Sequence, residues 1–306
     1  MLRATLLYTC LTTALLLSHS SKGQYALDAG FNLGFANYLG EIGGGAGPAR
    51  DWIFDLKLDQ TRWNPGGFVR YRLDYNFAIA ASLNFARLQA ADSLSENPNR
   101  FTRNLHFRND IVELATTAEY YFFSQPDVGR TGRYLLDFKA YVFAGIGMFY
   151  NNPKANLNGQ WIALQPLKTE GQSKPYSKMQ ACIPLGIGLF YTFSRVHRFG
   201  WNLSWRYTFT DYIDDISGQY PDPATLDGNA LLLSNRTSEV ANDPLAVDLA
   251  QYYVKGGVRG NPDSKDSYLL MSFTYSYVFR GSSKSFGHRK NYLYGRKRGR
   301  AGRARF

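Results

Sequence analysis

The stretch at residues 269–279, LLMSFTYSYVF, decides the fold because its side chains alternate in character with a period of two. The apolar and aromatic set is Leu269, Met271, Phe273, Tyr275, Tyr277 and Phe279. The hydroxyl-bearing set between them is Ser272, Thr274 and Ser276. This pattern predicts a β-strand with one apolar face and one small, polar face.

Seven other stretches alternate in the same way, which predicts an all-β chain of eight strands. They are residues 25–36, 68–75, 77–85, 112–122, 137–148, 183–191 and 201–209. After the first 23 residues, no stretch reaches 18 consecutive apolar residues, so membrane-spanning helices are excluded. Eight such strands could close as a soluble lipocalin-like barrel, pack as a sandwich, or form a membrane barrel. The less apolar face is rich in Gly, Ser and Ala, which favours the narrow lumen of an eight-stranded antiparallel transmembrane β-barrel.

The gaps between the strands alternate in length, as in outer-membrane barrels. Long gaps at residues 39–65, 90–106, 151–179 and 211–266 predict extracellular loops. Shorter gaps at residues 74–76, 124–135 and 194–198 predict periplasmic turns, which would leave both termini in the periplasm.

The chain has 306 residues and a net charge of +11. Its sequence falls into three segments of different composition. Residues 1–23 combine Arg3 with an apolar run over residues 4–17, which predicts a signal peptide cleaved before Gln24. Residues 24–280 hold all 24 acidic residues and an equal number of Lys and Arg, and form the predicted barrel. The excess charge therefore lies at the ends, and a protein-wide nucleic-acid interface is excluded.

Residues 281–306 form a basic tail without acidic residues, which predicts a disordered periplasmic extension. It is either a solvated extension or a segment that docks electrostatically on an acidic periplasmic partner, on the phospholipid headgroups of the outer membrane or on peptidoglycan. The docking candidates are Arg296, Lys297, Arg298, Arg300, Arg303 and Arg305.

Charged residues on the polar faces of the strands are candidates for ion pairs that fill the lumen. They are Arg70, Arg72, Glu113, Glu119, Asp137, Lys139 and Arg206. Glu113 and Glu119 lie six residues apart on one strand, roughly 20 Å, which is too far for a catalytic carboxylate pair. No Ser or Cys has a nucleophile context near a His, so the sequence predicts neither an enzyme nor a cofactor.

A cluster of carboxylates in residues 210–217, TDYIDDIS, could chelate calcium through Asp211, Asp214 and Asp215. The spacing matches no known calcium loop. Capping and turn hydrogen bonds are the plainer interpretation of these aspartates.

Several segments together resemble the PorG-like outer-membrane barrels of the type IX secretion system of Bacteroidota. They are residues 141–147 (YVFAGIG), 152–155 (NPKA), 164–167 (LQPL), 169–172 (TEGQ), 176–177, 180, 183–184, 186–188 (GIG), 210–217, 260–261 and 266–268. The resemblance covers about residues 25–280, is most specific over residues 141–188, and does not include the tail.

The resemblance implies a non-enzymatic subunit of a protein secretion machine, which in many relatives also supports gliding motility. Its implied role is to link the outer membrane to a periplasmic ring formed by a lipoprotein and associated secretion-system subunits. Two alternatives stay open: a passive small pore or an adhesin that binds ligands through its long loops, and, less favoured, a lipid-modifying enzyme.

Overall fold

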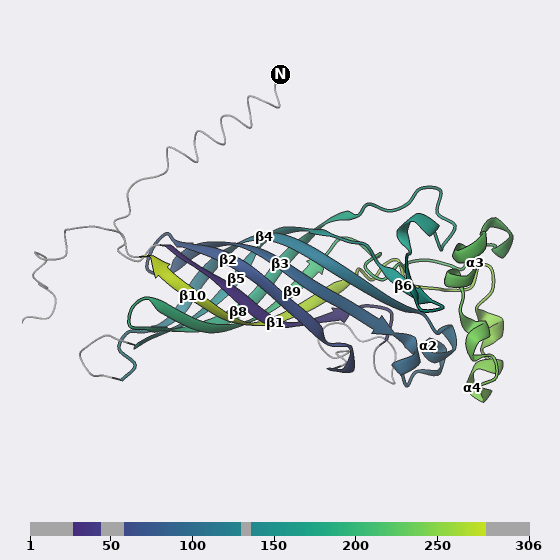
Figure 1. Ribbon diagram of the computed structural model, residues 1–306, viewed down its shortest axis with the longest axis horizontal. Coiled ribbons are helices and arrows are strands. Elements are labelled where there is room, and N and C mark those ends of the chain that lie inside the picture. Colours follow the sequence, from purple (N-terminus) through teal and green to yellow (C-terminus); the bar gives the residue numbers. More distant parts are fainter. Residues whose placement is uncertain (1–26, 44–57, 130–135, 280–306) are drawn as a thin grey trace, which may run out of the picture.

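The computed structural model describes residues 27–43, 58–129 and 136–279. Eight long strands close into an antiparallel barrel, as the alternation predicts (Figure 1). The strands are β1 (Leu27–Leu39), β2 (Arg62–Arg72), β3 (Phe77–Ala91), β4 (His106–Gln125), β5 (Leu136–Tyr150), β8 (Met179–Phe193), β9 (His197–Thr208) and β10 (Ser267–Phe279). Each strand pairs with its neighbours in the chain order of these eight, and the pairing of β1 with β10 closes the barrel.

The outer wall of the barrel is apolar and exposed. Ile146 is 74%, Leu114 62% and Phe273 59% exposed, although each lies in the middle of a strand. A soluble barrel would bury such side chains, so this wall fits the hydrocarbon of a bilayer. No helix within the described residues is long and apolar enough to span a membrane.

The inner wall carries small and polar side chains, and the seam between β1 and β10 is especially tight. Gly34 lies opposite Ser272, and a Cβ on Gly34 would overlap the backbone carbonyl of Met271. Glycine is therefore required here by the close approach of two backbones rather than by its dihedral freedom.

The two ends of the barrel differ (Figure 1). At one end short turns connect β2 to β3 and β8 to β9, and the described ends of β1 and β10 lie beside each other. At the other end, residues 40–43, 58–61, 92–105, 151–178 and 209–266 gather into a layer that we call the cap. This asymmetry agrees with the alternation of gap lengths in the sequence.

The cap is built from short elements. They are η2 (Leu58–Gln60), η3 (Asp92–Leu94), α2 (Pro98–Arg103), the hairpin of β6 (Lys154–Leu157) and β7 (Gln160–Ala163), η4 (Gln165–Leu167), η5 (Pro223–Thr225), α3 (Gly228–Ser234), η6 (Thr237–Val240), α4 (Pro244–Val247) and η7 (Ala250–Tyr252). Asn97 caps α2, because its side chain accepts a hydrogen bond from the backbone N–H of Asn99 at 3.0 Å. The strand β6 joins the sheet through one pairing with β4.

Candidate functional site

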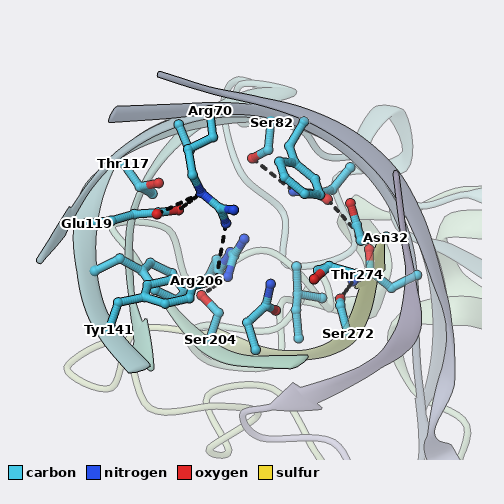
Figure 2. A pocket seen from close by; sticks show the side chains of 17 residues that line it. Asn32, Arg70, Ser82, Thr117, Glu119, Tyr141, Ser204, Arg206, Ser272 and Thr274 are labelled. Atoms are coloured by element: carbon cyan, nitrogen blue, oxygen red, sulfur yellow. Dashed lines mark hydrogen bonds and ion pairs between the residues drawn. The ribbon is translucent and has the colours of Figure 1, made fainter. Parts of the chain in front are cut away.

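The lumen contains a first layer of buried ion pairs near the short-turn end. Arg70 projects inward from β2 and lies 2.8 Å from a carboxylate oxygen of Glu119 on β4 (Figure 2). It also lies 3.2 Å from a carboxylate oxygen of Asp28 on β1. Asp28 also pairs with Arg198 on β9, so two cations and two anions neutralise each other. Tyr141 borders this layer and lies with its ring centroid 5.5 Å from the Arg70 guanidinium carbon. Each buried charge therefore has a partner, as burial requires.

A second layer lies closer to the cap and is centred on Glu113. The guanidinium of Arg206 donates to this carboxylate through Nη2 at 2.9 Å and Nε at 3.0 Å. The hydroxyl of Tyr268 donates to it at 2.6 Å, and the Asn84 side chain donates at 3.2 Å. Glu113 is only 1% exposed, so these four donors replace water entirely.

Between the two layers lies a polar chamber of about 60 Å³, bordered by Asn32, Ser82, Thr117, Ser204, Ser272 and Thr274 among others (Figure 2). A volume of this size holds only a few water molecules. Among the described residues, the lumen is therefore closed by side chains rather than open as a channel.

The lumen residues proposed from sequence divide into two groups. Arg70, Glu119, Glu113 and Arg206 form the pairs just described.

Arg72, Asp137 and Lys139 differ from the sequence interpretation, because none of them makes an ion pair with another described residue. The Lys139 ammonium lies 4.7 Å from the ring centroid of Tyr75 and 4.9 Å from that of Tyr121. Arg72 lies 5.8 Å from the same Tyr121 ring, and Asp137 accepts from a turn N–H at 3.4 Å. Aromatic rings at the mouth of the barrel thus take the place of carboxylates for these cations.

A buried arginine joins separate segments of the cap. Arg103 on α2 donates to both carboxylate oxygens of Asp92, at 2.7 and 3.0 Å. The same guanidinium donates to the backbone carbonyls of Glu41 and Arg259, at 2.8 and 2.9 Å. One side chain therefore connects three cap segments that are distant in sequence.

A second cluster joins segments that carry the family resemblance. Asp215 accepts hydrogen bonds from the hydroxyls of Thr169 and, at 2.7 Å, Tyr176. Arg259 donates to Glu170 at 2.9 Å and to the backbone carbonyl of Asp215 at 2.6 Å. Asp215 has a left-handed backbone with φ of 71°, which is unfavourable for a residue other than glycine and is held here by these contacts.

The three candidate calcium ligands do not converge. Asp214 accepts from the hydroxyl of Tyr38 at 2.7 Å and from the N–H of Ile216 at 2.9 Å, whereas Asp215 belongs to the cluster above. Within residues 27–43, 58–129 and 136–279, no group of three or more His, Cys, Asp or Glu has the arrangement of a metal site. Because Asp214 and Asp215 are occupied by hydrogen bonds in different directions, the turn interpretation describes them better than the calcium interpretation.

Burial of these cap carboxyls shifts their protonation. It raises the pKa of Glu41 to about 7 and the pKa values of Asp211 and Asp215 to about 6. Burial raises the pKa values of Asp214 and Asp266 well above the usual range. Repulsion adds to the effect, from Asp266 at Asp214 and from Asp211 and Glu41 at Asp266. The cap therefore holds protons near neutral pH that an unfolded chain would release.

An open cleft of about 630 Å³ lies on the cap between α2 and the segment that precedes β10. It is bordered by Asn97, Asn99, Arg100, Tyr252, Tyr253, Glu41 and residues 256–261. Tyr252 is 62% exposed, so an aromatic ring faces the solvent at its edge. No sequence pattern indicates this cleft, because its walls come from segments that only the fold brings together.

The remaining candidates fall outside these clusters or outside the described residues. The docking candidates of the tail, the signal peptide and its cleavage point before Gln24 all lie outside the described residues. His106 and His197 each contact neighbouring cap or barrel groups far from each other, and Cys182 is buried in the barrel.

Comparison with solved structures finds small outer-membrane barrels at low identity. The N-terminal β-barrel domain of OprF from Pseudomonas aeruginosa is 13% identical, with 84% of this chain and 99% of that chain covered and a TM-score of 0.35. OprG from the same organism is 11% identical, with 85% and 99% covered and a TM-score of 0.35. Ail from Yersinia pestis, solved with the heparin analogue sucrose octasulfate, is 9% identical, with 83% and 98% covered and a TM-score of 0.33.

Comparison with curated proteins gives no match. One family model matches residues 6–235, which is most of the chain. The chain belongs to the family described as Domain of unknown function (DUF6089).

Proposed function

We propose that this protein is a non-enzymatic outer-membrane barrel that anchors a periplasmic ring of the type IX secretion machine, which also serves gliding in some bacteria. The closed lumen is the observation that carries the choice of an anchor over a channel. Two layers of buried ion pairs leave a chamber of only about 60 Å³, so the barrel offers no path for a secreted protein. The barrel must then act through the segments that it presents at its two ends.

The resemblance to PorG-like barrels supports the secretion role. The resembling segments at residues 169–172 and 210–217 are far apart in the chain, yet they meet in the cap through Asp215 and Glu170. The similarity therefore belongs to one three-dimensional unit rather than to scattered strand patterns. On this proposal the short-turn end and the tail face the periplasm, where the ring lipoprotein and its associated subunits would bind.

The test is capture of partners from native outer membranes by cross-linking and mass spectrometry. Tagged full-length protein is compared with a truncation after Arg280 and with a variant in which the six tail residues Arg296, Lys297, Arg298, Arg300, Arg303 and Arg305 are Gln. The proposal expects ring proteins with the full-length chain. It expects salt-sensitive loss of them in both variants if the tail is the docking element. A barrel recovered without ring proteins from membranes that contain the machine would refute the anchor role.

The second candidate function is adhesion through the cap, favoured by the open cleft of about 630 Å³ and the exposed Tyr252 at its edge. Replacing Tyr252 with Ala should then reduce binding of whole cells to host or bacterial surfaces without changing barrel folding. The closed lumen speaks against the passive-pore alternative.

A further inference from the structure

Two cations face each other on the outer wall of the barrel at the cap end, and neither forms an ion pair with another described residue. Arg108 on β4 and Lys154 on β6 are direct cross-strand partners. Directly opposed side chains lie on the same face with Cβ atoms about 5 Å apart, and like charges there are destabilising. Two positive charges are therefore unexpected at these directly opposed positions.

The guanidinium of Arg108 packs against an aromatic ring. Its central carbon lies 4.0 Å from the ring centroid of Trp161 on β7, and its Nε is buried without a hydrogen-bond partner among the residues that the structure describes. Trp161 is opposite Asn156 and so lies on the same face as Lys154, two residues away. The ring thus orients the guanidinium beside the ammonium.

The acidic residues near this pair already form ion pairs with other arginines. Asp110, two residues from Arg108 on the same strand face, receives the Arg87 guanidinium at 2.5 and 3.1 Å. Glu239 is held by Arg236 at 2.9 and 3.0 Å. Among the described residues, Arg108 and Lys154 therefore carry two positive charges that no carboxylate neutralises.

The height of the pair on the wall identifies the class of ligand. Val112 and Tyr150, which pair across β4 and β5, are 39% and 38% exposed and belong to the apolar belt. Arg108 is four residues beyond Val112, roughly 13 Å along the strand or about 9 Å in height at a tilt near 45°. This is the level at which lipid phosphates lie above the hydrocarbon.

We propose that Arg108 and Lys154, backed by Trp161, bind the phosphate of a lipid headgroup in the leaflet at the cap end. A phosphate accepts two hydrogen bonds from the planar guanidinium and a third from the ammonium, and it removes the repulsion between the two cations. The indole ring provides the apolar-to-polar transition typical of interfacial tryptophans. The site depends on the barrel lying in a membrane and not on a role in secretion.

The experiment measures binding of diphosphoryl lipid A, of dephosphorylated lipid A and of inorganic phosphate to the full-length barrel in a neutral detergent. Arg108→Gln/Lys154→Gln is compared with Lys174→Gln/Lys265→Gln, which removes two charges from exposed cap loops. Removing two cations at a membrane surface should weaken diphosphoryl lipid A binding roughly 10- to 30-fold. The control should bind as the wild type does, and the dephosphorylated lipid should bind equally weakly to all three proteins.

Folding of each variant is checked by the heat-dependent shift in gel mobility, and Arg108→Lys, which keeps the charge, should retain most of the binding. In detergent without lipid, Lys154→Gln should be more resistant to urea than the wild type, because it removes the like-charge repulsion. Equal binding of diphosphoryl lipid A by the wild type and the folded double variant would overturn the proposal. Tight binding of inorganic phosphate without any preference for the lipid would overturn the assignment to a headgroup.

Discussion

Replacing Glu113 with Gln tests whether the lumen layers stabilise the barrel. The substitution keeps the shape of the side chain but removes the negative charge that faces Arg206, which is 5% exposed. An arginine left buried without its anion costs about 3–5 kcal/mol. At a typical urea dependence of about 2 kcal/mol/M, a loss of about 3 kcal/mol lowers the unfolding midpoint by about 1.5 M.

The measurement is reversible urea unfolding in lipid vesicles, followed by tryptophan fluorescence and by gel mobility. Glu96→Gln is the matched control, because Glu96 is exposed in the cap and should change stability by less than about 0.5 kcal/mol. Glu113→Leu combined with Arg206→Met should recover much of the lost stability, since it removes both buried charges. An unfolding free energy for Glu113→Gln within about 0.5 kcal/mol of the wild type would refute the view that this layer is dry and tightly coupled.

Three further predictions follow from the wall, the lumen and the cap. Gly34→Val should prevent folding, seen as loss of the heat-dependent gel shift, because its side chain would overlap the backbone of β10; a folded variant would contradict the tight seam. The wild type should give no steady conductance in planar bilayers, because two layers of ion pairs close the lumen; stable wild-type channels would contradict the closed lumen. Since Glu41 and Asp215 have pKa values of about 7 and about 6, above those of unfolded carboxyls, the folded cap binds extra protons. Its stability should be highest below about pH 4 and fall as the pH rises from there through 7, measured as faster amide exchange in residues 211–217, and Glu41→Gln should weaken this dependence.

The barrel could be predicted from sequence because alternation with period two is a local property of each strand. Parity alone predicts which side chains form the outer wall and that Arg70, Glu119, Arg206 and Glu113 point into the lumen, once the strands are identified. The pairing of Arg70 with Glu119 and of Arg206 with Glu113 comes from the structure. The polar face of the first strand also contains Asp28. The sequence therefore predicts that Asp28 points into the lumen, but it does not predict which residues pair with it.

Other contacts form only when distant segments of the chain come together, so the local sequence pattern does not predict them. The gap lengths place Arg198 in a turn at residues 194–198, but β9 already begins at His197 and Arg198 pairs with Asp28 on β1. In the cap, Arg103 and Arg259 join segments that share no periodic pattern. The β6 and β7 strands, four residues each, are too short to show alternation.

The seam between β1 and β10 sets the order in which this protein can be assembled. The first and last described strands pair along their whole lengths, from Leu27 with Phe279 to Leu39 with Ser267. Until β10 has been synthesised, β1 has an open edge that can pair with any other strand, including that of a second chain. Pairing between the most distant parts of a chain is also the slowest kind to form. Assembly must therefore follow synthesis of the complete barrel, and the unfinished chain needs protection of the β1 edge during that interval.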